Sequence, residues 1–328
     1  MKRGADQQHV IGIDLGGTKI LVALFDGRQR LLAREKKSTK PQLGAPAVVA
    51  RVAECVHDAL ASAAVPHTAV AAVGVGVPGL VETRTGLVRV APNLHWQNFP
   101  FGRLLSRQLR IPVVVVNDVQ AGTLAVQHFG AGRRLQHFVC MFIGTGIGGG
   151  LVLHGQLYRG AAGMGGEIGH MVALAQDGPK CGCGNHGCLE AVASRSAIVR
   201  RIVTEIEEGR KSQVTELCDG DLRRIRSRIL AKAYHDGDKL VREVIHDACD
   251  HIGHGAANLI NMLNPQAVIL GGGVIEALGP VMLPRIRRAA WRHVIGATDE
   301  RVNIVDSGLG DDAGILGSAL AARQHLKP

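Results

Sequence analysis

The sequence predicts an α/β protein with two related lobes, and three observations lead to that fold class. Short runs of β-branched and other apolar residues alternate with longer stretches patterned for helix, as in α/β architectures. The apolar hairpin pattern of residues 10–25 occurs again at residues 139–153. A chain of 328 residues with 46% apolar content is long enough for two packed domains, because single hydrophobic cores stop growing before this size.

The individual elements follow from length and periodicity. Short apolar runs predict strands at 10–14, 20–25, 70–77, 112–116, 138–143, 150–155, 267–272 and 302–305. Longer amphipathic stretches predict helices at 45–63, 103–110, 119–129, 191–207, 223–262, 280–292 and 313–325. The 223–262 helix has a predicted break near His235–Asp238. No segment is of low complexity.

Each of the two similar hairpins consists of an apolar strand, a Gly/Thr turn and a second apolar strand. Two such hairpins predict two related domains that face each other across an interdomain cleft, each offering a Gly-rich turn to one ligand. This is the outline of an actin-like (ribonuclease H-like) fold of the hexokinase/actin ATPase type.

The Gly-rich turns are candidate phosphate-binding loops, because glycine lets backbone N–H groups approach an anion. Asp14 sits at the end of the first strand and can hold Mg²⁺ through water. A single turn of this kind is as typical of an ordinary β-hairpin as of a phosphate-binding loop. Neither turn is a Walker A loop. The candidate nucleotide-binding residues are Asp14, Gly16, Gly17, Thr18 and Lys19 in the first turn, Gly144, Thr145 and Gly146 in the second, and Gly271, Gly272 and Gly273 after the 267–272 strand.

A candidate general base follows the strand at 112–116. Asn117 and Asp118 lie where this strand gives way to a helix, and sites in α/β sheets gather at the carboxyl ends of strands. Phosphoryl transfer to an alcohol needs a carboxylate that accepts the hydroxyl proton, and Asp118 can supply it. The alternative is that Asp118 only caps the helix.

Polar side chains that could bind a sugar occur at several other positions. Asn93, Asn117, Glu167 and Glu190 are candidates, because a sugar site needs rigidly held hydrogen-bonding groups. Glu167 and His170 form Glu-x-x-His and would share one face of a helix, although the surrounding glycines favour a loop.

A cysteine cluster at residues 181–190 predicts a metal site. Cys181, Cys183 and Cys188 place three thiols on a Gly-rich turn, and soft sulfur ligands favour Zn²⁺. A fourth ligand is needed, and both His170 and His186 qualify by chemistry. A closed site of four protein ligands would make the zinc structural.

Composition argues against other classes of protein. The net charge of +10 favours an anionic substrate such as ATP, but only 3% of residues are aromatic and little sequence precedes the first strand, so we expect no specific nucleic-acid partner. No apolar run approaches the ~20 residues that span a bilayer, and the first residues do not resemble a signal peptide. We therefore expect a cytoplasmic protein with no membrane partner.

Taken together, these motifs resemble the ROK family (repressors, open reading frames and kinases), especially its bacterial glucokinases. The resemblance runs along almost the whole chain and is specific because the motifs occur in the family's order. They are IGIDLGGTKI (11–20), GVGVPGLVETRTGLVRVAPNLHW (74–96), VNDVQAG (116–122), GTGIGGG (144–150), GEIGHM (166–171), CGCGNHGCLE (181–190), GGGV (271–274) and DDAGILGSALAA (311–322).

The resemblance implies a specific role for each candidate. It implies that Asp118 is the base, and that Asn93, Asn117, Glu167, His170 and Glu190 contact the sugar. It also implies zinc ligands His170, Cys181, Cys183 and Cys188, which decides against His186. ATP and Mg²⁺ would be required, and a homodimer or a dimer of dimers is expected. By analogy, the small lobe covers residues 1–120 plus 311–328, and the large lobe covers 121–310.

The implied activity is that of an ATP-dependent glucokinase. N-acetylmannosamine kinase and fructose kinase of the same family are alternatives, since the sequence does not fix the hexose, and polyphosphate is an alternative donor. A sugar-responsive transcriptional regulator would need a DNA-binding element beyond these motifs. An actin-like chaperone or filament protein would have no need for the Glu-x-x-His and cysteine motifs.

Overall fold

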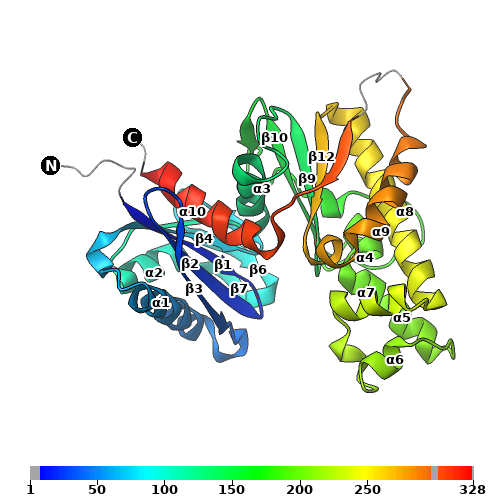
Figure 1. Cartoon of the computed structure of the whole chain (residues 1–328), viewed down its shortest axis with the longest axis horizontal. Helices are drawn as coiled ribbons and strands as arrows, with labels where there is room; N and C mark the ends of the chain where they lie inside the picture. The colour runs from blue at the N-terminus through cyan, green and yellow to red at the C-terminus, as the bar shows by residue number, and fades with distance from the viewer. Residues whose placement is uncertain (1–7, 297–301, 327–328) are drawn as a thin grey trace. The chain divides into compact units, whose positions relative to one another are not determined.

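The structure, a computed structural model, describes residues 8–296 and 302–326. The chain divides into two compact units (Figure 1). The first unit contains 1–129, 159–164 and 312–328, and the second contains 130–158 and 165–311. The lobe boundaries implied by the family resemblance stay a prediction.

The sheet of the first unit has the strand order β3-β2-β1-β4-β8. The outer three strands form an antiparallel meander, whereas β1, β4 and β8 run parallel. Its strands are β1 (His9–Leu15), β2 (Lys19–Phe25), β3 (Leu31–Ser38), β4 (Val70–Val77) and β8 (Val113–Asn117). Since parallel strands end at the same edge, the carboxyl ends of β1, β4 and β8 lie together.

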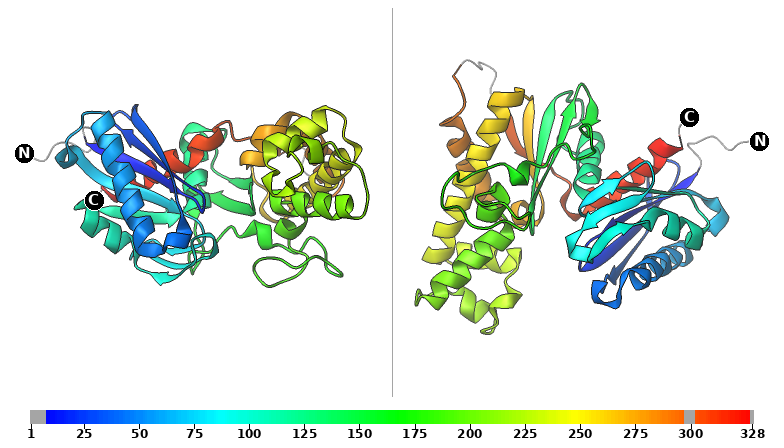
Figure 2. Two further views of the ribbon diagram at one scale, coloured as in Figure 1. Left: turned by 90° about the horizontal axis from the view of Figure 1, so that it is seen from below. Right: turned by 180° about the vertical axis from the view of Figure 1, so that it is seen from behind.

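Helices cover both faces of this sheet (Figures 1 and 2). Alternate side chains of β1, such as Ile11 and Ile13, are buried with α1 (Ala45–Ser62) and α2 (Phe101–Leu109). Val10 on the opposite face is buried with α10 (Ala313–His325), which also packs against α3 (Asp118–Phe129). A smaller sheet of β5 (Leu80–Glu82), β6 (Leu87–Ala91) and β7 (Trp96–Phe99) adjoins this core.

Glycine permits the close approach of α10 to the sheet. A Cβ atom at Gly74 of β4 would lie 1.8 Å from the backbone oxygen of Ser318 in α10. Any side chain larger than hydrogen would therefore push the helix away from the strand.

The sheet of the second unit repeats the topology of the first. Its order is β11-β10-β9-β12-β13, with an antiparallel meander followed by parallel strands. The hairpin β9–β10 occupies the place that β1–β2 has in the first unit, which confirms the internal repeat predicted from the sequence. The strands are β9 (Phe138–Ile143), β10 (Ile147–Leu153), β11 (Gln156–Tyr158), β12 (Ala267–Gly271) and β13 (Asn303–Asp306).

The second unit has its own core, in which apolar side chains of β9 and β12 are buried against helices. Figure 1 shows the long helices α8 and α9 side by side, and they pack closely against each other. The helices are α4 (Leu189–Ala193), α5 (Arg195–Glu207), α6 (Val214–Leu217), α7 (Ser227–His235), α8 (Lys239–Leu263) and α9 (Gly273–Trp291). None of the described helices is both long and apolar enough to cross a membrane.

The structure agrees with most predicted elements and corrects several; the helix predicted at 191–207, for example, is divided at Ser194 into α4 and α5. The break near His235–Asp238 is confirmed: α7 ends at His235, and the side chain of Asp238 caps α8 by accepting from Val241 N at 2.9 Å. The helix predicted at 280–292 begins earlier, at Gly273, with Pro280 and Pro284 inside it. Strand β3 was not predicted, because half of its residues are charged and none is buried, and the short strands β5, β6, β7 and β11 were not predicted either.

Candidate active site

Asn117 and Asp118 lie at the carboxyl end of β8 and are held by a local hydrogen-bond network. Asn117 Oδ1 accepts from Gln120 N at 3.0 Å, so Asn117 is the residue that caps α3. Asp118 Oδ1 accepts from Val119 N at 2.9 Å and from Asn117 Nδ2 at 3.1 Å. Asn117 Nδ2 also donates to Gly79 O at 3.0 Å. Asn117 therefore performs the capping that was the alternative explanation for Asp118.

The first Gly-rich turn lies at the same edge of the sheet. Gly16 N donates to Lys19 O at 2.9 Å and closes the turn. A Cβ atom at Gly17 would lie 2.9 Å from Asn93 O, so the predicted phosphate loop directly contacts a predicted sugar-binding residue. Asp14 is the penultimate residue of β1 and lies beside Gly314 of α10.

Thr39 supports this turn and was not identified from the sequence. Its side chain is fully buried, and its Oγ1 donates to Gly16 O at 2.6 Å. Its backbone N–H donates to Thr18 O at 3.0 Å. A polar residue directly after the charged strand β3 offers no sequence signal of this role, because the contact spans more than twenty positions.

The second Gly-rich turn, in the second unit, is held by Glu190. Gly144 N donates to Gly146 O at 2.9 Å, and Ile147 N donates to Glu190 Oε2 at 2.9 Å. A Cβ atom at Gly146 would lie 2.1 Å from the same carboxylate oxygen. Glycine at this position therefore lets the Glu190 carboxylate reach the loop backbone.

The third glycine cluster meets the second loop. Gly272 has a φ of +86°, and a Cβ atom there would lie 2.7 Å from Ile143 O, at the end of β9. A Cβ atom at Gly273 would lie 3.9 Å from Ser227 Oγ of α7. The turns after β9 and β12 are therefore neighbours at the carboxyl edge of this sheet, where sites of α/β folds gather.

Glu167 and His170 lie on a single turn of 3₁₀ helix, η5 (Ile168–His170), with Glu167 as its N-cap residue. His170 Nε2 is 4.0 Å from Glu167 Oε2. The sequence left open whether this segment is a helix or a loop, and the structure has a single 3₁₀ turn, which is intermediate between the two. The imidazole therefore has Nε2 on the side of the Glu167 carboxylate and Nδ1 on the side of the cysteines.

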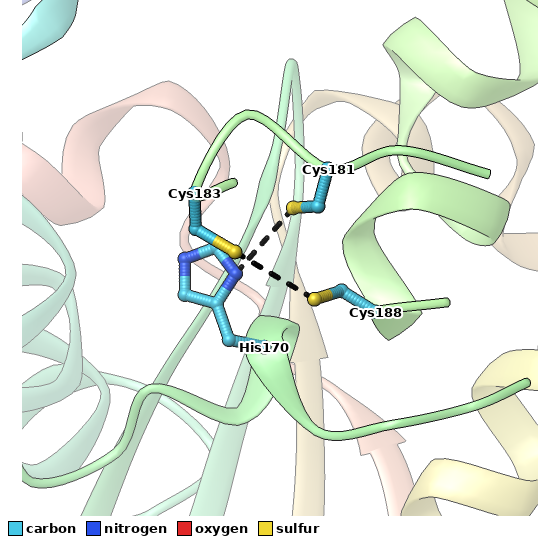
Figure 3. Close-up of side chains that lie close together, drawn as sticks. All are labelled: His170, Cys181, Cys183 and Cys188. Atoms are coloured by element: carbon cyan, nitrogen blue, oxygen red, sulfur yellow. Dashed lines mark hydrogen bonds between the residues drawn. The ribbon is translucent and has the colours of Figure 1, made fainter. Parts of the chain in front are cut away.

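His170, Cys181, Cys183 and Cys188 converge (Figure 3), and their ligand atoms all lie within 4.8 Å of one another. Cys181 Sγ is 3.7 Å from His170 Nδ1, and Cys183 Sγ is 3.7 Å from Cys188 Sγ. Sulfur atoms bound tetrahedrally to one zinc ion would be about 3.8 Å apart, given Zn–S bonds of about 2.3 Å. The donor set and its spacing therefore fit a closed zinc site.

Backbone bonds hold the two halves of this cluster together. Leu189 N donates to Met171 O at 2.9 Å, and Ala173 N donates to Gly187 O at 2.7 Å. His186 pairs through its backbone with Lys180 and lies outside the ligand group found in the described residues.

The thiols of the cluster differ in acidity. Burial raises the pKa of Cys188 to about 12, whereas a hydrogen bond from the Asn185 backbone lowers the pKa of Cys183. A thiolate at Cys188 therefore needs a cation beside it, which a bound zinc ion would provide.

The candidate residues thus form two sets, one in each unit. The first unit brings Gly17 next to Asn93, and Asn117 next to Asp118. The second unit links the Gly144–Ile147 turn to Glu190, and Glu190 Oε1 lies 3.7 Å from Cys181 Sγ. Glu190 therefore connects the metal-ligand cluster to the candidate phosphate loop.

Comparisons with known proteins give a consistent result. The model of the ROK family matches residues 10–325. A glucokinase from Thermotoga maritima is 34% identical over 97% of this chain and 98% of its own length. A xylose repressor from Caldicellulosiruptor bescii is 30% identical over 95% of this chain and 77% of its own length.

The same pattern holds for solved structures. The crystal structure of a ROK family glucokinase from Streptomyces griseus in complex with glucose and AMPPNP superposes with a TM-score of 0.86 at 33% identity. The match covers 96% of this chain and 99% of that chain. This likeness confirms the actin-like, hexokinase-type fold class predicted from the sequence.

Proposed function

The chain belongs to the ROK family, and from this premise we propose that it is an ATP-dependent glucokinase. The reaction transfers the γ-phosphoryl group of ATP to the 6-hydroxyl of glucose and yields glucose 6-phosphate and ADP. The observation that carries this proposal is the near full-length match to glucokinases in both sequence and structure, including one crystallised with glucose and AMPPNP.

Asp118 is the proposed general base. Its carboxylate accepts the proton of the sugar hydroxyl as that oxygen attacks the γ-phosphorus atom. The network of Asn117 and Val119 around Oδ1 supports this role, because a base must be held in a fixed orientation relative to the hydroxyl.

The Gly-rich turns are the proposed phosphate sites. Backbone N–H groups of the Gly16–Lys19 and Gly144–Gly146 turns, other than those of Gly16 and Gly144 that close the turns, stabilise the negative charge on the phosphoryl oxygens, and Gly271–Gly273 lie against the nucleoside. Asp14 is the residue that would hold Mg²⁺, since its oxygen ligands suit this hard cation. When bound, Mg²⁺ would neutralise part of the negative charge of the phosphates.

The proposed sugar contacts are Asn93, Asn117, Glu167, His170 and Glu190. Support comes from the contact of Asn93 with Gly17 and from the Glu167–His170 pair on η5. Zinc would be held by His170, Cys181, Cys183 and Cys188. It would fix the segment that carries Glu167 and His170 and would take no part in the chemistry.

Substrate choice and assembly are the finer parts of the proposal. Glucose is the proposed hexose, with N-acetylmannosamine or fructose as alternatives, and ATP is the proposed donor, with polyphosphate as its alternative. The proposed assembly is a homodimer or a dimer of dimers, which light scattering of the purified protein would measure.

A coupled assay over a panel of sugars tests the function. Purified protein is given ATP or polyphosphate together with glucose, mannose, fructose or N-acetylmannosamine, and kcat/KM is measured for each pair. We expect the highest kcat/KM for glucose with ATP. A higher value for another sugar would move the assignment to that kinase, and failure to phosphorylate any sugar would refute it.

A further inference from the structure

Arg195 attaches the start of α5 to the second Gly-rich turn. Its backbone N–H donates to Gly144 O at 3.0 Å, and its Nη2 atom donates to Thr145 Oγ1 at 2.6 Å. Ser194 caps the helix by accepting from Ala197 N at 3.2 Å, which fixes the backbone from which Arg195 projects. The guanidinium is therefore held beside two residues of the candidate phosphate loop.

The charge of Arg195 has no carboxylate partner within residues 8–296 and 302–326. Burial and the positive charge of nearby Arg226 both lower its pKa. Among the described residues, Arg226 donates to two carbonyl oxygens, those of Arg223 at 2.8 Å and Ile225 at 3.0 Å.

Two arginines elsewhere in this unit do have carboxylate partners. Arg201 pairs with Asp247 at 2.6 Å, and Arg285 pairs with Asp250 at 2.6 Å. Two neighbouring guanidinium groups without carboxylates repel each other, and a polyanion lying beside both would relieve that repulsion.

The position of Arg226 points to the same ligand. It directly precedes Ser227, whose Oγ lies near the third glycine cluster at Gly273. Arg195 thus lies beside the second turn, and Arg226 is the sequence neighbour of a residue beside the third. The guanidinium fork of Arg195 carries donors beyond the one that binds Thr145.

We propose that Arg195 is a donor-binding residue, which contacts phosphate oxygens of the phosphoryl donor while Arg226 strengthens the local positive charge. This inference rests on the proposed function, because it takes the Gly144–Gly146 turn as a phosphate site. The ligand class is a tri- or polyphosphate chain. The competing explanation is that Arg195 only braces Thr145.

The test compares Arg195→Gln, Arg195→Lys and Arg226→Gln with the wild type. Arg195→Gln should raise the KM for ATP about tenfold, as expected for loss of one charge-assisted hydrogen bond, with the KM for glucose changed less than about twofold. Arg195→Lys keeps the charge but loses the guanidinium fork, so its KM for ATP should lie between those of the wild type and Arg195→Gln. Arg226→Gln should raise the KM for ATP by a smaller factor. Arg228→Gln removes an exposed charge from the same helix as Ser227 and should leave both KM values unchanged.

Binding of inorganic tripolyphosphate, measured by calorimetry without sugar, separates this inference from the proposed function. We expect the wild type to bind it about tenfold more tightly than Arg195→Gln, with a difference that shrinks as salt rises. Equal binding, or no binding by the wild type, would overturn the inference. If Arg195 only braces Thr145, Arg195→Gln should have a lowered melting temperature and a parallel rise in the KM values for ATP and glucose. That result would also overturn the inference. An inactive wild type would defeat the proposed function and leave calorimetry to decide the role of Arg195.

Discussion

At Asp118, chemistry and local structure can be separated by one substitution. Asp118→Asn keeps an oxygen that can accept from Val119 N, but an amide cannot take up the hydroxyl proton. We expect kcat to fall by about 10²–10⁴-fold while the KM for glucose changes little. Steady-state kinetics on the variant measure both values.

A matched variant tests the neighbouring cap. Asn117→Ala removes the acceptor of Gln120 N and should lower the free energy of unfolding by about 1 kcal/mol. Thermal unfolding of the two variants distinguishes the roles, since Asp118→Asn should unfold close to the wild type. An Asp118→Asn protein with unchanged kcat would end the assignment of the base.

The metal cluster gives a second prediction at the scale of residues. The purified wild type should contain about one zinc ion per chain, and Cys188→Ser should lose most of it together with thermal stability. His186→Ala is the matched control, because His186 lies in the same turn but outside the ligand group. Elemental analysis measures the metal. Equal zinc loss in both variants, or a wild type purified gently without zinc, would contradict the proposed ligand set.

At the scale of elements, glycines that permit close approach fall into two kinds. At Gly74 the neighbour is backbone of α10, which cannot move without displacing the helix, so Gly74→Ala should cost about 3 kcal/mol or more of unfolding free energy. Gly279→Ala in α9 meets only ordinary contacts, 3.5 Å or more from its neighbours, and should be neutral or stabilising. Chemical denaturation measures both. A Gly74→Ala protein as stable as the wild type would refute the close packing of α10 on β4.

At Gly146 the neighbour is instead the mobile end of a side chain. Gly146→Ala should displace the Glu190 carboxylate from Ile147 N, lowering kcat/KM for ATP while changing the unfolding free energy by only about 1 kcal/mol. Kinetics and denaturation on the same preparation test this expectation. A large loss of stability with unchanged kinetics would show that Glu190 serves the fold alone.

The elements also show how far the sequence could lead. Strands such as β4 and β9 are predictable because continuous apolar runs between turn residues have few alternatives. The residues 31–38 form β3 because they pair with β2, a contact that periodicity does not report. The early start of α9 contradicts the expectation from its glycines and prolines, because packing in the core of the second unit outweighs local preference.

The sequence predicted which kinds of residue form the candidate site, but not the contacts that hold them in place. The metal ligands stand out because three cysteines lie within a short turn, yet the choice between His170 and His186 came from the family resemblance and not from spacing. The contacts of Thr39 with Gly16 and of Arg195 with Thr145 join residues far apart in the chain. Such contacts depend on the fold and leave no local pattern in the sequence.

At the scale of the whole molecule, the repeated sheet order explains why two similar hairpins occur in one chain. Each unit presents a Gly-rich turn between the two strands of its first hairpin, and each has its own hydrophobic core. The relatives of this chain include both glucokinases and a xylose repressor, so the fold by itself does not determine the activity. The activity must be measured on the intact chain.

The most direct test of the central claim is ³¹P NMR of the purified protein incubated with glucose, ATP and Mg²⁺. We predict that glucose 6-phosphate and ADP appear in equal amounts, with little inorganic phosphate. Formation of ADP with free phosphate would indicate an ATPase of the chaperone or filament type, and an unchanged ATP spectrum would show that the protein is not a glucokinase.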